Sequence, residues 1–198
     1  MGIRLWGKFL SCTNCMDKTN YPEEIVDVVD ENDAVIGKAT RGEVNRDPRL
    51  IHREIAVLIH DGEGRVFVQQ RSQAKDVMPL VWTLSAAGHI PSGVPPDEAA
   101  RMELEEELGF QTELRFRYKA RITVPTESVF SYLYIGQIPE GAAVRLNLDE
   151  AAQGRFVSEA ELDEMIAQGE AFDEYSLREM RRFFKRNWTQ IFRMNYNT

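Results

Sequence analysis

Cysteine is scarce in this chain: of its 198 residues, only Cys12 and Cys15 are cysteines. A single Cys-x-x-Cys pair cannot form a disulfide framework, so an apolar core must hold the fold together, as is usual in the reducing cytoplasm. A structural zinc site needs four ligands, and the sequence has no second cysteine pair. We therefore interpret the pair as incidental.

Long apolar runs are also missing. No stretch approaches the ~20 apolar residues of a membrane span. The start, MGIRLWGKFLSC, lacks the apolar segment and small-residue cleavage site of a signal peptide. Trp6 stands where an N-myristoylation signal after Gly2 requires Ser or Thr. The sequence therefore predicts a cytoplasmic protein without a membrane partner.

Basic residues are outnumbered: 24 Lys and Arg face 32 Asp and Glu, a net charge of −8. This balance argues against nucleic acid as a partner, because sequence-independent binding needs a basic surface. An anionic small molecule remains compatible, since metal ions and local cations can reverse the field inside a cleft. We interpret the basic residues near the C-terminus as a solvated helix face; they are Arg178, Arg181, Arg182, Lys185 and Arg186.

The length and the composition, 43% hydrophobic and 28% charged, suit one domain around one core. Residues 1–21 lack clear periodicity and are expected to be a loosely ordered extension, and residues 22–198 a single domain. The predicted strands cover 24–30, 34–37, 54–60, 66–70, 112–123 and 128–138, with a short one at Phe156. The predicted helices cover 96–108, 162–168 and 177–192.

The connections complete this outline. Residues 61–64 form a tight turn that pairs the flanking strands as a hairpin, and Gly109 ends the central helix. Segment 41–53 is expected to be irregular, and residues 72–87 are expected to form a long connection. Strands on both sides of one central helix, followed by terminal helices, predict an α/β layered sandwich around a mixed sheet.

The central helix carries an unusual group of acids. Positions i, i+3 and i+4 share a helix face, so Glu103, Glu106 and Glu107 point the same way. Their mutual repulsion and their place near the helix C-terminus both destabilise the helix. A divalent cation with oxygen ligands would explain the group, and a solvated acidic helix is the alternative.

Residues 88–110 resemble the Nudix box, in which a glycine is followed at fixed spacing by Arg-Glu-hydrophobic-x-Glu-Glu-x-Gly-hydrophobic. Over these 23 residues the matching positions are Gly88, Glu103, Leu104, Glu106, Glu107, Gly109 and Phe110. The flanking elements extend the resemblance over roughly residues 22–190. It implies a Nudix-type α/β/α sandwich and hydrolysis of a diphosphate linkage.

Two box positions depart from the family pattern. Val94 replaces an early glutamate, and Met102 replaces the arginine before Glu103. Both positions are apolar together, and replacing a partly buried ion pair by a packed apolar pair can be neutral. We therefore interpret the two departures as one coherent structural exchange.

The resemblance also implies roles for individual residues. Glu103 and Glu107 are the expected Mg²⁺ ligands, with Glu106 assisting and the Gly88 carbonyl contributing; Mn²⁺ is an alternative ion. Family members often take a further glutamate from a later loop. Glu150 fits that position and Glu127 is its rival, so the general base is Glu103, Glu150 or Glu127.

The segment Gln69–Lys75, with Trp82, Gly88 and His89, resembles the Nudix branch that includes isopentenyl diphosphate isomerase and its hydrolase relatives. This places Arg71 and Lys75 as phosphate-binding cations and His89 on the substrate side of the site. His52 and His89 fall where the isomerases carry metal-binding histidines. Ala87, however, replaces the cysteine that isomerisation uses.

The sequence thus predicts a Mg²⁺-dependent Nudix hydrolase acting on a nucleoside diphosphate derivative or a similar organic pyrophosphate. The alternatives are an isopentenyl diphosphate isomerase, which Ala87 disfavours, and a non-catalytic Nudix domain that binds a nucleotide and serves regulation. The branch also allows a homodimer.

Overall fold

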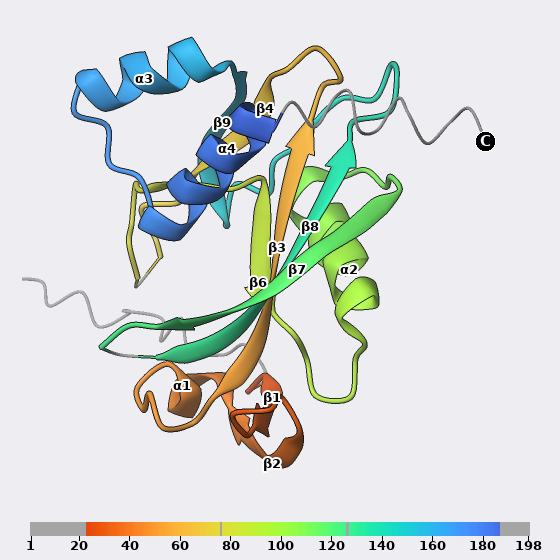
Figure 1. Cartoon of the computed structure of the whole chain (residues 1–198), viewed down its shortest axis with the longest axis vertical. Helices are drawn as coiled ribbons and strands as arrows, with labels where there is room; N and C mark the ends of the chain where they lie inside the picture. The colour runs from red at the N-terminus through yellow and green to blue at the C-terminus, as the bar shows by residue number, and fades with distance from the viewer. Residues whose placement is uncertain (1–22, 76, 126, 187–198) are drawn as a thin grey trace, which may run out of the picture.

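The computed structural model describes residues 23–75, 77–125 and 127–186. The predicted N-terminal extension with Cys12 and Cys15, and the predicted last helix beyond residue 186, lie outside these residues. A seven-stranded sheet forms the centre of the described part (Figure 1). Its strands are β3 (His52–His60), β4 (Val66–Arg71), β5 (Trp82–Thr83), β6 (Ala86–His89), β7 (Leu114–Thr123), β8 (Ser128–Gln137) and β9 (Ala151–Val157).

Strand β3 is the axis of this sheet. It runs parallel to β8 along its whole length and antiparallel to its other partners, so the sheet is mixed, as predicted. The opposite edge of β3 is divided between two strands. β6 pairs with residues 54–57, whereas β4 pairs only where His60 meets Val66. The predicted hairpin of β3 and β4 is therefore confirmed only at the pair beside its turn.

The divergence of β3 and β4 has a clear cause in the pairing of β4. This strand pairs along its length with β9 and at its end with β5, which draws it away from β3. Ser85 fills the resulting gap, because its fully buried hydroxyl accepts from Ile59 N (2.8 Å) and donates to Phe67 O (2.7 Å). One side chain thus satisfies two backbone groups that have lost their ladder partners.

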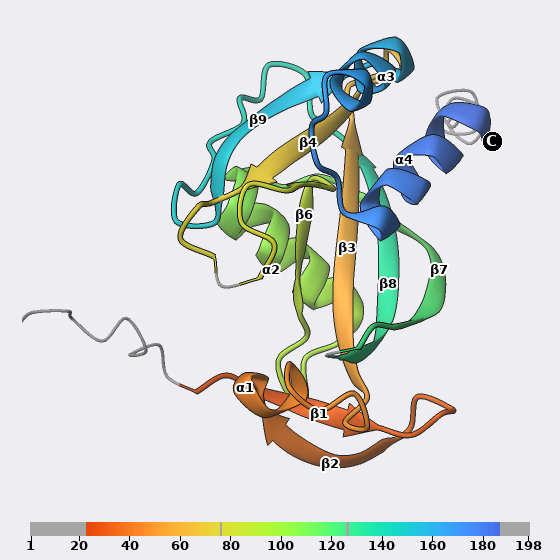
Figure 2. The same cartoon turned by 90° about the vertical axis from the view of Figure 1, so that its left-hand side faces the viewer.

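Helices cover both faces of the sheet, which confirms the three-layered α/β/α sandwich. Residues of β3 alternate between the two faces. Ile55, Val57 and Ile59 pack with α2 (Pro96–Leu108), while Ala56 and Leu58 lie in the second core cluster. That cluster includes residues of α3 (Glu159–Ala167) and α4 (Glu174–Arg186). Figure 2 shows α2 and α4 on opposite sides of β3.

A separate two-stranded sheet, β1 (Ile25–Val29) and β2 (Val35–Thr40), lies near the start of β3 (Figure 1). It leads into a one-turn helix, α1 (Arg41–Val44), whose capping box is formed by Thr40 and Glu43. The prediction that segment 41–53 is irregular is therefore wrong in part, because it includes α1 and the start of β3. Arg53 Nε donates to Asp33 Oδ1 (2.6 Å) and Ser92 Oγ to Asp27 Oδ1 (2.6 Å), which ties this sheet to the main domain.

Local capping accounts for the helix boundaries. The prediction for α2 is confirmed at both ends, and Gly109 closes the helix with a left-handed φ of 71°. α3 begins earlier than predicted because Ser158 and Glu161 form a capping box. α4 also begins earlier, where the Asp173 carboxylate accepts from Ser176 N. The long connection at residues 72–87 includes β5 and the start of β6.

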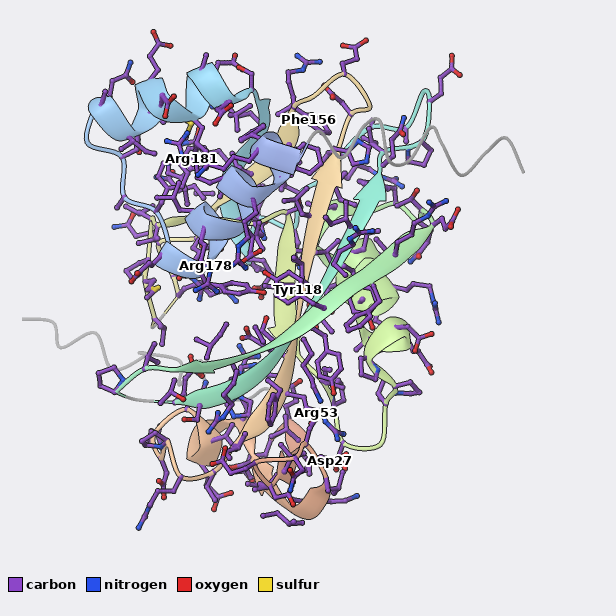
Figure 3. The ribbon with its side chains drawn as sticks, in the orientation of Figure 1. Asp27, Arg53, Tyr118, Phe156, Arg178 and Arg181 are labelled. Carbon is purple, nitrogen blue, oxygen red and sulfur yellow. The ribbon has the colours of Figure 1, made fainter. Side chains whose placement is uncertain are left out.

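The basic face of α4 is neutralised by neighbouring acids. Arg181 pairs with Asp163 on α3, and both Arg178 Nε and Arg182 Nη1 lie 3.0 Å from Glu179 Oε1. Tyr118, which points from β7 toward α4 in Figure 3, donates to the buried Glu179 carboxylate. Arg178, Arg181 and Arg182 are thus paired with acids, although their side chains stay 48%, 30% and 49% exposed.

Replacing Ser85 by alanine should destabilise the fold strongly for so small a change. The substitution leaves Ile59 N and Phe67 O buried without their partner, which costs about 2 kcal/mol in the free energy of unfolding. Urea unfolding followed by tryptophan fluorescence measures the loss. A decrease smaller than about 0.5 kcal/mol would contradict the bridging role given to this hydroxyl.

Candidate functional site

Glu107 of α2 is a carboxylate buried in the middle of the domain. Its side chain is 4% exposed, accepts a hydrogen bond from Gln69 Nε2, and lies 3.3 Å from Ala87 N. Burial raises the pKa of Glu107 to about 8, although the hydrogen bond from Gln69 opposes this shift. The groups that donate hydrogen bonds to Glu107 are neutral amides, so no positive charge balances the ionised carboxylate. A cation bound to it would therefore offset much of the free-energy cost of burying that charge.

Glu103, one turn earlier, packs directly against Gly88 of β6. A Cβ atom at position 88 would collide with the Glu103 carboxylate, so the glycine is what permits this approach. Burial, together with the charges of Glu106, Glu24 and Glu150, raises the pKa of Glu103 to about 7. Glycine at the head of the box and glutamate on the helix are thus two halves of one contact.

Glu106 stands apart from these two. Its side chain is exposed and, with Glu105 and Met102, lines an open hollow on the outer side of α2. The prediction that three glutamates share one environment therefore holds only partly, although Glu106 remains near enough to raise the pKa of Glu103. Met102 is 50% exposed while Val94 packs against the core, so the two do not form a fully buried apolar pair.

Glu150, just before β9, forms an ion pair with Lys75, which follows β4. Its charge is also among the causes that raise the pKa values of Glu103 and Glu107. Asn147 N donates to Glu107 O (3.0 Å) and Glu150 N donates to Asn147 O (3.0 Å), so the segment that carries Glu150 is joined to the end of α2. We call Glu103, Glu107 and Glu150 the carboxylate cluster.

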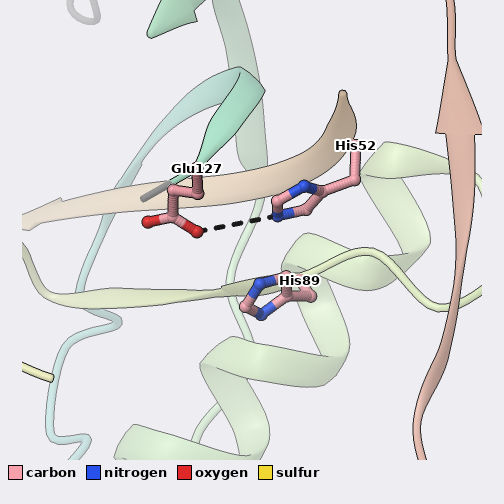
Figure 4. Close-up of side chains that lie close together, drawn as sticks. All are labelled: His52, His89 and Glu127. Carbon is pink, nitrogen blue, oxygen red and sulfur yellow. Dashed lines mark ion pairs between the residues drawn. The ribbon is translucent and has the colours of Figure 1, made fainter. Parts of the chain in front are cut away.

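Glu127 belongs to a different group. One ligand atom each from His52, His89 and Glu127 lie within 4.8 Å of one another, and Figure 4 shows the three side chains converging from separate segments. We call these residues the imidazole cluster. Among the described residues they are the His and acidic side chains whose ligand atoms converge this closely, as the ligands of a metal ion would.

The protonation of His52 explains why this second group suits a cation. His52 Nδ1 lies 3.3 Å from Leu50 O, and a carbonyl can only accept, so Nδ1 carries the proton. The buried Nε2 then presents a lone pair toward Glu127 Oε2 at 3.9 Å and has no hydrogen-bond partner. Two acceptors that face each other leave a place for a positively charged ion.

Both histidines of this cluster are neutral. Burial lowers the pKa of His52 to about 4 and that of His89 to about 3, the nearby Arg41 contributing to the latter. The rings stack with centroids 4.9 Å apart, and His89 Nε2 lies 3.0 Å from Asn45 Oδ1. Neutral imidazole is the form that binds metal ions.

The two clusters lie on opposite sides of the same short strand. Gly88 and His89 are consecutive in β6, so their side-chain positions face opposite faces of the sheet. Within the described residues β6 pairs with β3 alone, so its other edge has no ladder partner there.

Comparison with known proteins identifies the family of this chain. Residues 50–180 match the model of the NUDIX domain. The chain belongs to the Nudix family. Among solved structures, DR0079 from Deinococcus radiodurans superposes with a TM-score of 0.69 at 25% identity, covering 81% of this chain and 99% of that one.

Curated Nudix relatives carry two kinds of name. The chain is 34% identical over 159 residues to an uncharacterised Nudix hydrolase of Streptomyces coelicolor, covering 75% of this chain and 82% of the relative. It is 32% identical over 151 residues to the isopentenyl-diphosphate Delta-isomerase of the same organism, covering 73% and 76%. An uncharacterised Nudix hydrolase of Listeria monocytogenes is 32% identical over 167 residues, covering 83% and 96%.

The predicted phosphate-binding residues lie at the end of β4, but each is engaged by the protein. Arg71 Nε donates to Val77 O (3.0 Å), which holds the following loop, while its charge opposes the rise that burial causes in the pKa of Glu127. Lys75 pairs with Glu150, and His89 lies in the imidazole cluster.

Three residues near the site were missed from the sequence. Gln69 donates to Glu107, and Asn45 contacts His89. Arg41 pairs with Glu24 (3.1 Å), and its charge partly offsets the burial that raises the pKa values of Glu103 and Glu127. Gln69 follows Phe67 in the alternation of β4, which could have revealed it, whereas Arg41 lies in a segment expected to be irregular.

No helix of the described residues is both long and apolar enough to cross a membrane.

The stability of the metal-free protein should fall as pH rises from 6.5 to 8.5. Glu107 ionises near pH 8 in the folded state but at its ordinary value of 4.5 when unfolded, so its stabilising protonated form is lost as pH rises through 8. The imidazoles do not interfere, because their lowered pKa values matter only below about 6.5.

Urea unfolding in EDTA at pH 6.5, 7.5 and 8.5 tests this expectation. One titrating group changes the free energy of unfolding by at most about 1.4 kcal/mol per pH unit. Glu103 and Glu54, whose pKa values are raised to about 7, share the slope below pH 7, so Glu107→Gln should remove the slope chiefly between pH 7 and 8. Equal slopes in the two proteins would show that Glu107 is not the group responsible.

Proposed function

We propose that this Nudix protein hydrolyses the diphosphate linkage of a nucleoside diphosphate derivative or similar organic pyrophosphate, with Mg²⁺ as its metal ion. The observation that carries the proposal is the burial of Glu107, with Glu103 packed against Gly88, at the acidic positions of the Nudix box. Buried carboxylates whose pKa values are shifted to about 7 and 8 are typical of functional sites.

The donor atoms of the carboxylate cluster suit a hard divalent cation. Glu103, Glu107 and Glu150 offer carboxylate oxygens, and Gly88, whose carbonyl would add a further oxygen ligand, packs against Glu103. Glu106 would assist from its exposed position on the same helix. Mg²⁺ there would neutralise diphosphate oxygens and lower the pKa of a bound water, and Mn²⁺ would serve in its place.

The protein side chains supply the remaining chemistry. Lys75 and Arg71, together with Arg41, are the cations placed to hold phosphate oxygens. A carboxylate of the cluster accepts the proton of the attacking water. The products are two phosphorylated fragments of a small molecule of the cytoplasm.

Isomerisation of isopentenyl diphosphate is the second candidate, favoured by the isomerase relatives and by the imidazole cluster. Isomerisation adds a proton to one carbon atom of the substrate and removes a proton from another, so it requires an acid beside the substrate. The chain offers the methyl group of Ala87 at the position where the isomerases of this branch carry cysteine. We therefore place hydrolysis first.

Glu107→Gln should abolish Mg²⁺-dependent hydrolysis while leaving the fold intact. The amide keeps the shape of the side chain and can still accept from Gln69, but it loses the charge that holds the cation. We expect kcat/KM to fall at least about a thousandfold, measured on a panel of nucleotide sugars, dinucleotides and isoprenoid diphosphates.

The matched control is Glu105→Gln, which removes an exposed carboxylate from the same helix. It should retain near-wild-type turnover. Undiminished activity of Glu107→Gln would refute the site assignment. Wild-type protein that is stabilised by a nucleotide but never turns it over would favour a regulatory binding domain instead.

The isomerase alternative has its own test. Isopentenyl diphosphate incubated with the protein and Mg²⁺ or Mn²⁺ in D₂O should gain no deuterium on carbon, because position 87 has no acid side chain. Proton NMR of the recovered diphosphate measures the exchange. Deuterium incorporation at an enzyme-dependent rate would place this chain among the isomerases.

A further inference from the structure

Lys75 and Glu150 are brought together by the backbone and not by their charges. Lys75 N donates to Ser72 O (3.2 Å), which closes a turn after β4, and Ser72 N donates to Glu150 O (2.8 Å). Glu150 N in turn donates to Asn147 O (3.0 Å). The main chain at both residues is thus fixed, so the two side chains can separate by changing rotamers alone.

The two residues of this ion pair have different roles in the proposed site. Glu150 is close enough to Glu103 and Glu107 for its charge to act on both. Lys75 is 19% exposed and Glu150 32% exposed, so the pair sits at the mouth of the carboxylate cluster and not in its depth. An ammonium group there occupies a carboxylate that a divalent cation would otherwise use.

We propose that Lys75 is an internal stand-in cation, which holds Glu150 until a divalent metal ion takes its place and then turns to the diphosphate of the substrate. The inference rests on the proposed function, since it assigns an order of events to the same site. Metal and diphosphate then favour each other: the metal releases Lys75 from Glu150, and the diphosphate keeps Lys75 from returning.

This exchange has a physical reason in the charge of the site. Three carboxylates near one another repel, and a lysine bound to one of them lowers that repulsion in the absence of metal. The same lysine competes with the metal for Glu150, so it weakens metal binding when no phosphate is present. Such a coupling between two ligands is reciprocal, so it can be measured from either side.

Lys75→Met tests the competition directly. With the ammonium removed, Mn²⁺ alone should bind about fivefold more tightly, a change typical of losing one partly exposed ion pair. Methylenediphosphonate, a diphosphate that cannot be hydrolysed, should bind more weakly in the presence of Mn²⁺. Electron paramagnetic resonance of free Mn²⁺ and titration calorimetry give the two affinities without any need for turnover.

Glu150→Gln should produce the opposite pattern. Mn²⁺ alone should bind at least about fivefold more weakly, whereas methylenediphosphonate without metal should bind more tightly because Lys75 is no longer held. Lys75→Arg should keep the wild-type order of affinities. Lys119→Met is the matched control, since Lys119 also pairs with a carboxylate, Asp33 (2.6 Å), but lies on β7.

Weaker or unchanged Mn²⁺ binding by folded Lys75→Met would overturn the proposal, and so would unchanged Mn²⁺ binding by Glu150→Gln. If Lys75→Met fails to fold by circular dichroism, the same measurements on Lys75→Gln decide the question. Failure of the proposed function is a separate result, namely wild-type protein that binds Mn²⁺ and methylenediphosphonate but hydrolyses no diphosphate.

Discussion

The architecture of this Nudix protein depends on placing negative charge where water is largely excluded. Glu107 is inside the domain and Glu103 is pressed against the backbone of β6. Neither position is favourable for a carboxylate in isolation, because burial destabilises the charged form. The surrounding fold supplies neutral hydrogen-bond donors, a glycine that allows close approach, and a helix. Together these fix the two acids in positions where a cation can bind them.

The division of the β3 edge is what makes room for this arrangement. If β4 continued alongside β3, β6 could not pair there and Gly88 could not meet Glu103. Ser85 makes the division possible by satisfying the backbone groups at the fork. A buried hydroxyl with no catalytic task therefore sets the position of the site.

The sequence was most informative where local rules act. The spacing of Pro96, the glutamates and Gly109 predicted α2 to the residue, and the resemblance of the box located Gly88 beside the acids. It failed where distant segments decide the outcome. Strand alternation could not show that β4 prefers β9 to β3, and a loop acid such as Glu150 gives no sign of the lysine that will meet it.

The two-residue step from Gly88 to His89 links two chemically different environments, one of oxygen donors and one of nitrogen donors. A planar peptide bond joins these residues and has no soft torsion of its own. The contact of Gly88 with Glu103 and the ring of His89 are therefore carried by one short stretch of backbone. A substitution that displaced this stretch would disturb both environments at once.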